Sequence, residues 1–172
     1  MKDDVLKIED VAKIIPDRIE AGTYLAMAAA TGGRVKLLNV YEEHIKPIIY
    51  KLEECGCNIE LHGREIVISA PKKLIAIDIK TMPYPGFPTD MQSVFGAMLT
   101  IAKGTSVIVE NIFENRYKYC NELQKMGAKI QIEGKMAVIK GTRKLYGSKV
   151  EALDLRRRCE LSFSRAYSKR KN

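Results

Sequence analysis

An aspartate that follows a proline-rich segment is the first candidate for chemistry in this sequence. The stretch PYPGFPTDMQ, residues 83–92, holds three of the chain's six prolines, and Asp90 follows them at the start of a predicted helix. Proline suits the first helical position and an acid in the first turn is favoured by the free N–H groups, so helix initiation alone accounts for the pattern. A carboxylate fixed at one place is also the kind of group that serves as a general base.

Cysteine and histidine give no pattern typical of a metal site or a disulfide framework. The four cysteines are unevenly spaced, at Cys55, Cys57, Cys120 and Cys159. No second pair accompanies CGC at 55–57, and only His44 and His62 remain as further ligands. We therefore interpret Cys55 and Cys57 as small buried residues near a turn.

Composition predicts a globular protein. The chain has 172 residues with 46% hydrophobic content, enough for one ordinary domain. No apolar run approaches about eighteen residues, so no membrane span is predicted. Mixed acids and bases near the first residue also speak against a secretory signal. We expect a cytoplasmic protein without a membrane partner.

The net charge of +8 suggests nucleic-acid binding, because basic patches neutralise phosphates. Residues 157–172, however, hold six basic residues and one acidic residue, a balance of +5, which leaves +3 for the rest of the chain. The body of the protein is only mildly basic, and we expect no nucleic-acid partner.

The sequence repeats at an interval of 71 residues. Identical pairs at this interval are Leu52 and Leu123, Gly56 and Gly127, Ile59 and Ile130, Gly63 and Gly134, Val67 and Val138, Ile68 and Ile139, and Leu74 and Leu145. We predict two α/β units, 17–87 and 88–158, which pack around a shared core. Residues 1–16 would end a preceding unit at a domain crossover, and residues 159–172 would form an aberrant basic tail.

Each unit is predicted as α-β-α-β-β-β with a mixed sheet. In the first copy, apolar spacing indicates a helix from Arg18 to a glycine cap and a strand at 34–40. A second helix follows at 42–56, with Pro47 in its first turn. Alternating residues then predict a hairpin at 57–69 and a third strand at 74–80. No glycine-rich nucleotide-binding motif occurs.

Six segments resemble one enzyme family in sequence and in order. They are PDRIEAGTYL, PYPGFPTDMQ, IAKGTS, ENIFENR, ELQKMGAKI and DLR at 154–156. From about Ile15 to Arg156 the chain closely resembles the UDP-N-acetylglucosamine 1-carboxyvinyltransferases, a family of enolpyruvyl transferases. The resemblance implies two similar domains, each an inside-out α/β barrel of three units, with substrates in the cleft between them. This chain matches less than half of such an enzyme.

The resemblance implies a reaction and a set of residues. The enolpyruvyl group of phosphoenolpyruvate moves to the 3-hydroxyl of UDP-N-acetylglucosamine and phosphate leaves, which is the first committed step of peptidoglycan synthesis. Asp90 matches the aspartate assigned to that hydroxyl, as base or as orienting acceptor. Ile112 matches a backbone contact to the nucleotide sugar, and Arg116 and Arg156 are candidates for anionic groups. Asp154 would orient the active site or Arg156.

Parts of the family's machinery have no counterpart here. The catalytic cysteine loop, a lysine near the N-terminus and several basic residues lie in regions that this sequence does not match, and none of its four cysteines corresponds to them. The resemblance implies no cofactor and no metal. We expect the isolated chain to be inactive.

The sequence departs from the family after DLR. The relatives continue with an apolar helix rich in small residues, whereas this chain reads RRCELSFSRAYSKRKN. A genuine basic tail is one interpretation, and a shifted reading frame is the other. One choice of codons for residues 157–171, read from its second base, encodes GAASLALAGLIAKG, which ends like IAKG at 101–104.

Two other functions compete with this assignment. The related shikimate-pathway enolpyruvyl transferase is disfavoured by FPTDMQ and ENIFENR, which resemble the nucleotide-sugar enzyme. A non-catalytic binding or interaction module is the other alternative. It would expose the apolar face that a third unit covers, which favours self-association.

Sequencing the gene tests the reading-frame hypothesis. We expect a one- or two-base repair near codon 157 to open a frame that continues with an apolar helix rich in small residues. A repaired frame that encodes no such helix contradicts the hypothesis and favours a genuine basic tail.

Overall fold

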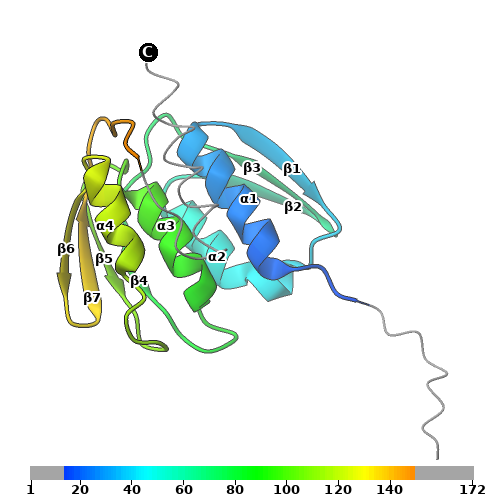
Figure 1. Ribbon diagram of the computed structural model, residues 1–172. Helices are drawn as coiled ribbons and strands as arrows, with labels where there is room; N and C mark the ends of the chain where they lie inside the picture. Colours follow the sequence, from blue (N-terminus) through cyan, green and yellow to red (C-terminus); the bar gives the residue numbers. More distant parts are fainter. Residues whose placement is uncertain (1–13, 150–172) are drawn as a thin grey trace, which may run out of the picture.

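Two β-sheets form the outer layers of the structure, and the helices lie between them (Figure 1). The computed structural model describes residues 14–149. Its first copy contains α1 (Arg18–Thr31), β1 (Arg34–Leu38), α2 (Glu42–Glu54), β2 (Asn58–His62), β3 (Glu65–Ser69) and β4 (Ile79–Lys80). Its second copy contains η1 (Thr89–Met91), α3 (Gln92–Leu99), β5 (Thr105–Val109), α4 (Lys118–Lys125), β6 (Lys129–Glu133) and β7 (Met136–Lys140). Helices inside and sheets outside confirm the predicted α/β arrangement.

Residues at both ends of α1 fix its limits. The Asp17 carboxylate accepts hydrogen bonds from the N–H groups of Ile19, at 2.7 Å, and Glu20, at 3.4 Å. At the other end Gly32 has φ +66°, and its N–H donates to the carbonyl of Ala29. A left-handed residue here closes the helix, as the glycine pair predicted.

Pro47 does not lie in the first turn of its helix, so that prediction is wrong. α2 begins at Glu42, which makes Pro47 its sixth residue. A proline there removes the hydrogen bond to the carbonyl of Glu43. The helix continues because its apolar side is buried: Ile45, Ile48, Ile49 and Leu52 are all nearly inaccessible. Packing of that side stabilises α2 despite the missing bond.

The third strand predicted at 74–80 forms only in part. Ile75 makes a single parallel bridge with Lys103, and only Ile79–Lys80 becomes a strand. This strand, β4, pairs in parallel with β5 of the second copy, with Ile79 opposite Ile108. The second sheet therefore has the order β4-β5-β7-β6, while the first has β1-β3-β2. The apolar alternation at 74–80 indicated that part of this segment is buried, but it did not indicate that the strand pairs with β5 of the second copy.

The 71-residue repeat is visible in the backbone. Equivalent N–H to carbonyl bonds are Cys57 to Leu52 (3.0 Å) and Ala128 to Leu123 (3.0 Å), Ile75 to Cys55 (3.0 Å) and Tyr146 to Met126 (2.8 Å), and Ala70 to Gly33 (3.0 Å) and Gly141 to Gly104 (2.9 Å). Strand register is also shared, since Val35 opposes Ile68 and Ser106 opposes Ile139. The counterpart of β4 falls at 150–151, outside the described residues.

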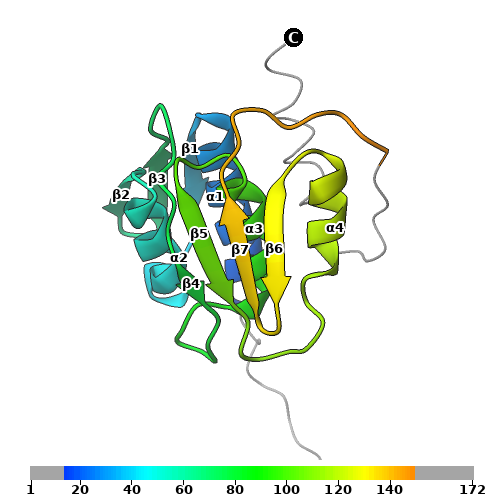
Figure 2. The same cartoon turned by 90° about the vertical axis from the view of Figure 1, so that its left-hand side faces the viewer.

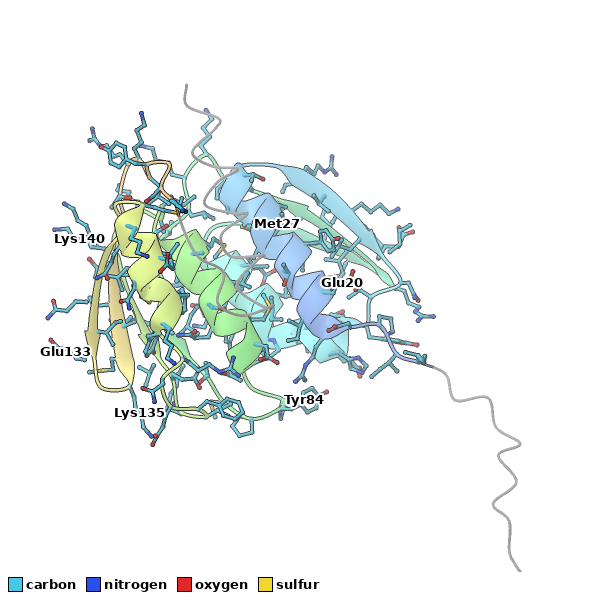
Figure 3. The ribbon with its side chains drawn as sticks, in the orientation of Figure 1. Glu20, Met27, Tyr84, Glu133, Lys135 and Lys140 are labelled. Atoms are coloured by element: carbon cyan, nitrogen blue, oxygen red, sulfur yellow. The ribbon has the colours of Figure 1, made fainter. Side chains whose placement is uncertain are left out.

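The core lies where the helices meet the inner faces of the sheets. Ile130, Ala137 and Ile139 of the second sheet are buried, whereas Glu133 and Lys140 point outward on its far face (Figure 3). Figure 2 shows this sheet face-on, with α3 behind it. None of the helices within residues 14–149 is long and apolar enough to cross a membrane.

Replacing Gly141 with alanine should destabilise the second copy. The new Cβ would lie 1.7 Å from the carbonyl oxygen of Ala102, a backbone atom that has little room to move. We expect the free energy of unfolding to fall by about 2–3 kcal/mol in urea denaturation. Gly147→Ala is the control, because among residues 14–149 no atom beyond the adjacent residues lies within 4 Å of its Cβ position, and it should change stability by less than about 0.5 kcal/mol. Equal stability of the two variants contradicts the prediction.

Candidate functional site

Asp90 lies in a single 3-10 turn, η1, that leads into α3. Pro88 precedes this turn in extended conformation, with φ −72° and ψ 137°. The proline therefore takes the cap position and not the first helical position that the sequence predicted. Tyr84 lies in the loop before α3 (Figure 3), and the Arg18 guanidinium lies 5.0 Å from the centre of its ring. This cation–π contact joins the proline-rich loop to the start of α1.

Arg116 comes to Asp90 from the loop after β5. An Nη atom of Arg116 lies 3.5 Å from Asp90 Oδ1. The Arg116 side chain is 29% exposed and that of Asp90 is 32% exposed, so the pair is partly shielded but reachable from solvent. The guanidinium also lies 4.8 Å from the centre of the Phe113 ring. Two of the residues implied by the resemblance thus form one ion pair.

The loop that carries Arg116 replaces the first turns of a helix. In the first copy β1 ends at Leu38 and α2 begins at Glu42, whereas β5 ends at Val109 and α4 begins only at Lys118. Asn115, with φ +58°, takes the left-handed conformation that asparagine tolerates. The second copy therefore has a longer loop here, and Arg116 lies in it.

A buried carboxylate organises this loop. Glu110 is 1% exposed, and its Oε1 accepts hydrogen bonds from the N–H groups of Ile112, at 2.9 Å, and Phe113, at 3.3 Å. The Thr81 hydroxyl donates to the same oxygen at 2.8 Å, and the Thr89 hydroxyl donates to Oε2 at 2.8 Å. Four donors thus satisfy a charge that burial would otherwise make costly.

Tyr117, at the end of the same loop, connects it to β5 and to the turn between β6 and β7. Its hydroxyl lies 2.8 Å from the carbonyl oxygen of Ile108 and 3.0 Å from that of Lys135. Burial raises the pKa of Tyr117 to about 12, so the hydroxyl stays protonated and donates even near pH 10, where an ordinary tyrosine is about half ionised. The carbonyl of Lys135 also accepts a hydrogen bond from the N–H of Glu110, at 2.9 Å. The turn between β6 and β7 is thereby tied to the site.

Of the other three predicted site residues, only Ile112 lies within the described part of the chain. Ile112 is half-buried in the loop, beside Glu110. Asp154 and Arg156 lie outside the described residues. Within 14–149, no group of three or more His, Cys, Asp and Glu side chains has the arrangement of a metal site. Cys55 and Cys57 are buried, as their sequence context predicted.

A family model supplies the assignment. The model described as EPSP synthase (3-phosphoshikimate 1-carboxyvinyltransferase) matches residues 5–163, which is most of the chain. The chain belongs to the EPSP synthase family. Asp90, Glu110 and Arg116 all lie within the matched residues.

Curated relatives indicate which branch of the family it resembles. A UDP-N-acetylglucosamine 1-carboxyvinyltransferase of Desulfofundulus thermocisternus is 52% identical over 161 residues, which cover 89% of this chain and 66% of that protein. Enzymes of the same name from Caldanaerobacter subterraneus subsp. tengcongensis and Thermodesulfovibrio yellowstonii are 49% and 52% identical, and the matches span 39% and 37% of their lengths. The chain therefore matches well under half the length of the latter two relatives.

Solved structures share the fold. The enolpyruvyl transferase NikO from Streptomyces tendae has a TM-score of 0.75 at 20% identity, and the match covers 90% of this chain and 37% of that one. An EPSP synthase from Acinetobacter baumannii has a TM-score of 0.70 at 15% identity, with coverage of 91% and 38%. These likenesses confirm the fold predicted from the repeat.

Glu110 was not among the residues predicted for the site. It opens the ENIFENR motif, yet an acid after a strand looks like an ordinary surface residue. The repeat held a usable signal, because the position 71 residues earlier is the neutral Asn39. The acid at this position is therefore not required by the framework that the two copies share.

The buried thiols should be unreactive in the folded protein. Burial, with a smaller effect of neighbouring Cys57 and Glu54, raises the pKa of Cys55 to about 12, and burial raises that of Cys57 to about 11. Both thiols therefore stay protonated at pH 8, where an unperturbed cysteine with a pKa of about 8.5 begins to ionise. We expect alkylation by iodoacetamide, located by mass spectrometry, to modify Cys55 and Cys57 only after denaturation. Rapid labelling of either residue in the native chain contradicts this prediction.

Proposed function

We propose that this chain is part of an enzyme that transfers the enolpyruvyl group of phosphoenolpyruvate to UDP-N-acetylglucosamine. In that enzyme it supplies the residues that bind the sugar hydroxyl. The observation that carries the proposal is the Asp90–Arg116 pair, 3.5 Å apart and partly open to solvent. It occurs in a chain about half identical to relatives that bear the name of this enzyme. The 15% identity to a solved EPSP synthase supports the shikimate-pathway alternative less well.

Asp90 is the proposed partner of the 3-hydroxyl. A carboxylate within hydrogen-bond reach can orient the hydroxyl for attack or take its proton as the new C–O bond forms. Arg116 holds the Asp90 carboxylate from one side. Because a guanidinium has five N–H donors, Arg116 also has donors to offer an anionic group of either substrate.

Ile112, Asp154 and Arg156 complete the proposed set. The N–H of Ile112 donates to Glu110, so a backbone contact between Ile112 and the nucleotide sugar falls to its carbonyl oxygen. Asp154 and Arg156 enter the proposal through the resemblance of DLR alone. Location in the cytoplasm and self-association through an apolar face stay predictions from the sequence.

Turnover needs both substrates held together between two domains with water excluded. The match spans well under half the length of the second and third relatives above, so much of that arrangement has no counterpart in this sequence. We therefore expect the 172-residue chain alone to bind the nucleotide sugar weakly, with a Kd on the order of 1 mM, and to transfer nothing.

Binding of the nucleotide sugar is the first test of the proposal. We expect NMR titration with UDP-N-acetylglucosamine to shift resonances around Asp90, and Asp90→Asn to weaken binding by roughly tenfold through loss of a charged acceptor. Glu133→Gln, on the outer face of the second sheet, is the matched control and should bind like the parent. Absence of binding by a folded parent chain overturns the proposal for this chain.

Phosphate release from phosphoenolpyruvate separates family membership from activity. We expect none above background for the chain or for Asp90→Ala, and turnover only for a full-length product that also carries the cysteine loop and the N-terminal lysine. Turnover by the chain alone that disappears in Asp90→Ala contradicts its inactivity but supports the role of Asp90. A folded full-length product that releases no phosphate contradicts the assigned reaction.

A further inference from the structure

We propose that Glu110 is a positioning residue that fixes the Asp90–Arg116 pair from within the protein. The inference rests on the proposed function, because it concerns the same two side chains. Glu110 is 1% exposed, so it does not meet a substrate directly. It acts through the chain segments whose donors it binds.

The two oxygens of the Glu110 carboxylate bind different segments: one binds the η1 turn that carries Asp90, and the other binds the loop that carries Arg116. Oε2 accepts from the hydroxyl of Thr89, which is the residue directly before Asp90. Oε1 accepts from the N–H groups of Ile112 and Phe113, which begin the loop that carries Arg116. A single rigid group thus sets the separation between the η1 turn and the Arg116 loop.

Thr81 holds the carboxylate itself in place. This residue follows β4 and is fully buried. Its hydroxyl donates to Glu110 Oε1 at 2.8 Å and accepts from the N–H of Asn111 at 2.9 Å, while its carbonyl accepts from the Asn111 side chain at 3.2 Å. Hydrogen bonds on both sides of Glu110 leave its carboxylate little freedom to rotate.

The polarity of these bonds predicts which substitutions the site tolerates. Every partner donates to Glu110, so alanine removes the acceptor of all four donors, and only the Thr81 hydroxyl has a second acceptor nearby, the carbonyl of Val109 at 3.5 Å. Glutamine keeps one oxygen for Thr81 and the two amides and turns its NH₂ toward Thr89. The Thr89 hydroxyl can reverse and accept that hydrogen bond. Glu110→Gln should therefore preserve the geometry that Glu110→Ala destroys.

Thr89 offers a milder test of the same connection. It is half-buried, and Thr89→Val keeps its shape while removing the hydroxyl that joins the η1 turn to Glu110. Thr89→Ser keeps the hydroxyl and removes only a methyl group, so it is the matched control. Ser106→Ala controls for loss of stability. It removes a different buried hydrogen bond in the second sheet, in which the N–H of Ile77 donates to the Ser106 hydroxyl at 3.1 Å.

The readout is the side-chain Nε–H resonance of Arg116 in ¹⁵N-labelled protein without substrate, assigned by its loss in Arg116→Lys. Asp90→Asn should shift this resonance in the parent, because it removes the charge beside the guanidinium. We expect the same shift in the Thr89→Ser, Glu110→Gln and Ser106→Ala backgrounds. In the Thr89→Val and Glu110→Ala backgrounds, the shift caused by Asp90→Asn should be smaller by roughly twofold or more, because it requires the Asp90 and Arg116 side chains to be in contact. Backbone resonances of residues 34–69 report whether each variant is folded.

Three results overturn the inference: no response of Arg116 to Asp90→Asn in the parent, an equal response in Thr89→Val and Thr89→Ser, or a loss in Ser106→Ala as large as in Thr89→Val. If Glu110→Ala does not fold, the Thr89 pair decides the question. Because no substrate is present, the outcome is independent of nucleotide-sugar binding. A chain that keeps the coupling but binds no UDP-N-acetylglucosamine contradicts the proposed function and leaves the role of Glu110 in positioning the pair intact.

Discussion

The parallel pairing of β4 with β5 is the constraint on which the site depends. β4 belongs to the first copy and β5 to the second, and Ile79 lies opposite Ile108. Parallel strands bring their carboxyl ends to the same edge of a sheet. Thr81 and Glu110, the residues that follow the two strands, therefore meet at 2.8 Å. Neither copy alone contains this contact, so the site is a property of the junction between them.

The two copies share a framework and differ where chemistry is expected. Their turns, hydrogen bonds and strand registers agree, because each copy has the same packing problem of helices against a sheet. At an interval of 71 residues, by contrast, Asp90 replaces Ile19, Glu110 replaces Asn39 and Arg116 replaces Ile45. Apolar or neutral positions of one copy have become charged in the other. Charge differences also occur away from the candidate site, as between Lys36 and Val107, so such a difference indicates the site only together with the contacts seen in the structure.

Much of this fold could be predicted from local sequence, because apolar periodicity and glycine turns are local signals. The buried side of α2 and the glycine cap of α1 are examples. The short β4, the position of Pro47 and the burial of Glu110 were not predicted, since each depends on contacts distant in sequence. Glu110 binds hydroxyls 29 and 21 residues away, and nothing next to it in the chain distinguishes it from a solvated acid. The roles proposed for Asp90 and Arg116 came from family resemblance, and periodicity would not have suggested them.

The rigidity of the segment before Asp90 comes from more than its prolines. The N–H of Met82 donates to the carbonyl of Phe87 at 3.0 Å, so the two ends of the loop are joined. Phe87 is buried and packs edge-on against Phe95 of α3, with ring centres 5.0 Å apart. Prolines reduce the conformations open to the unfolded loop, while the Phe87 anchor and the Thr89–Glu110 bond select one of them. The entropy of ordering Asp90 is thus lost on folding. If Asp90 binds the sugar hydroxyl as proposed, the ligand does not have to supply that free energy on binding.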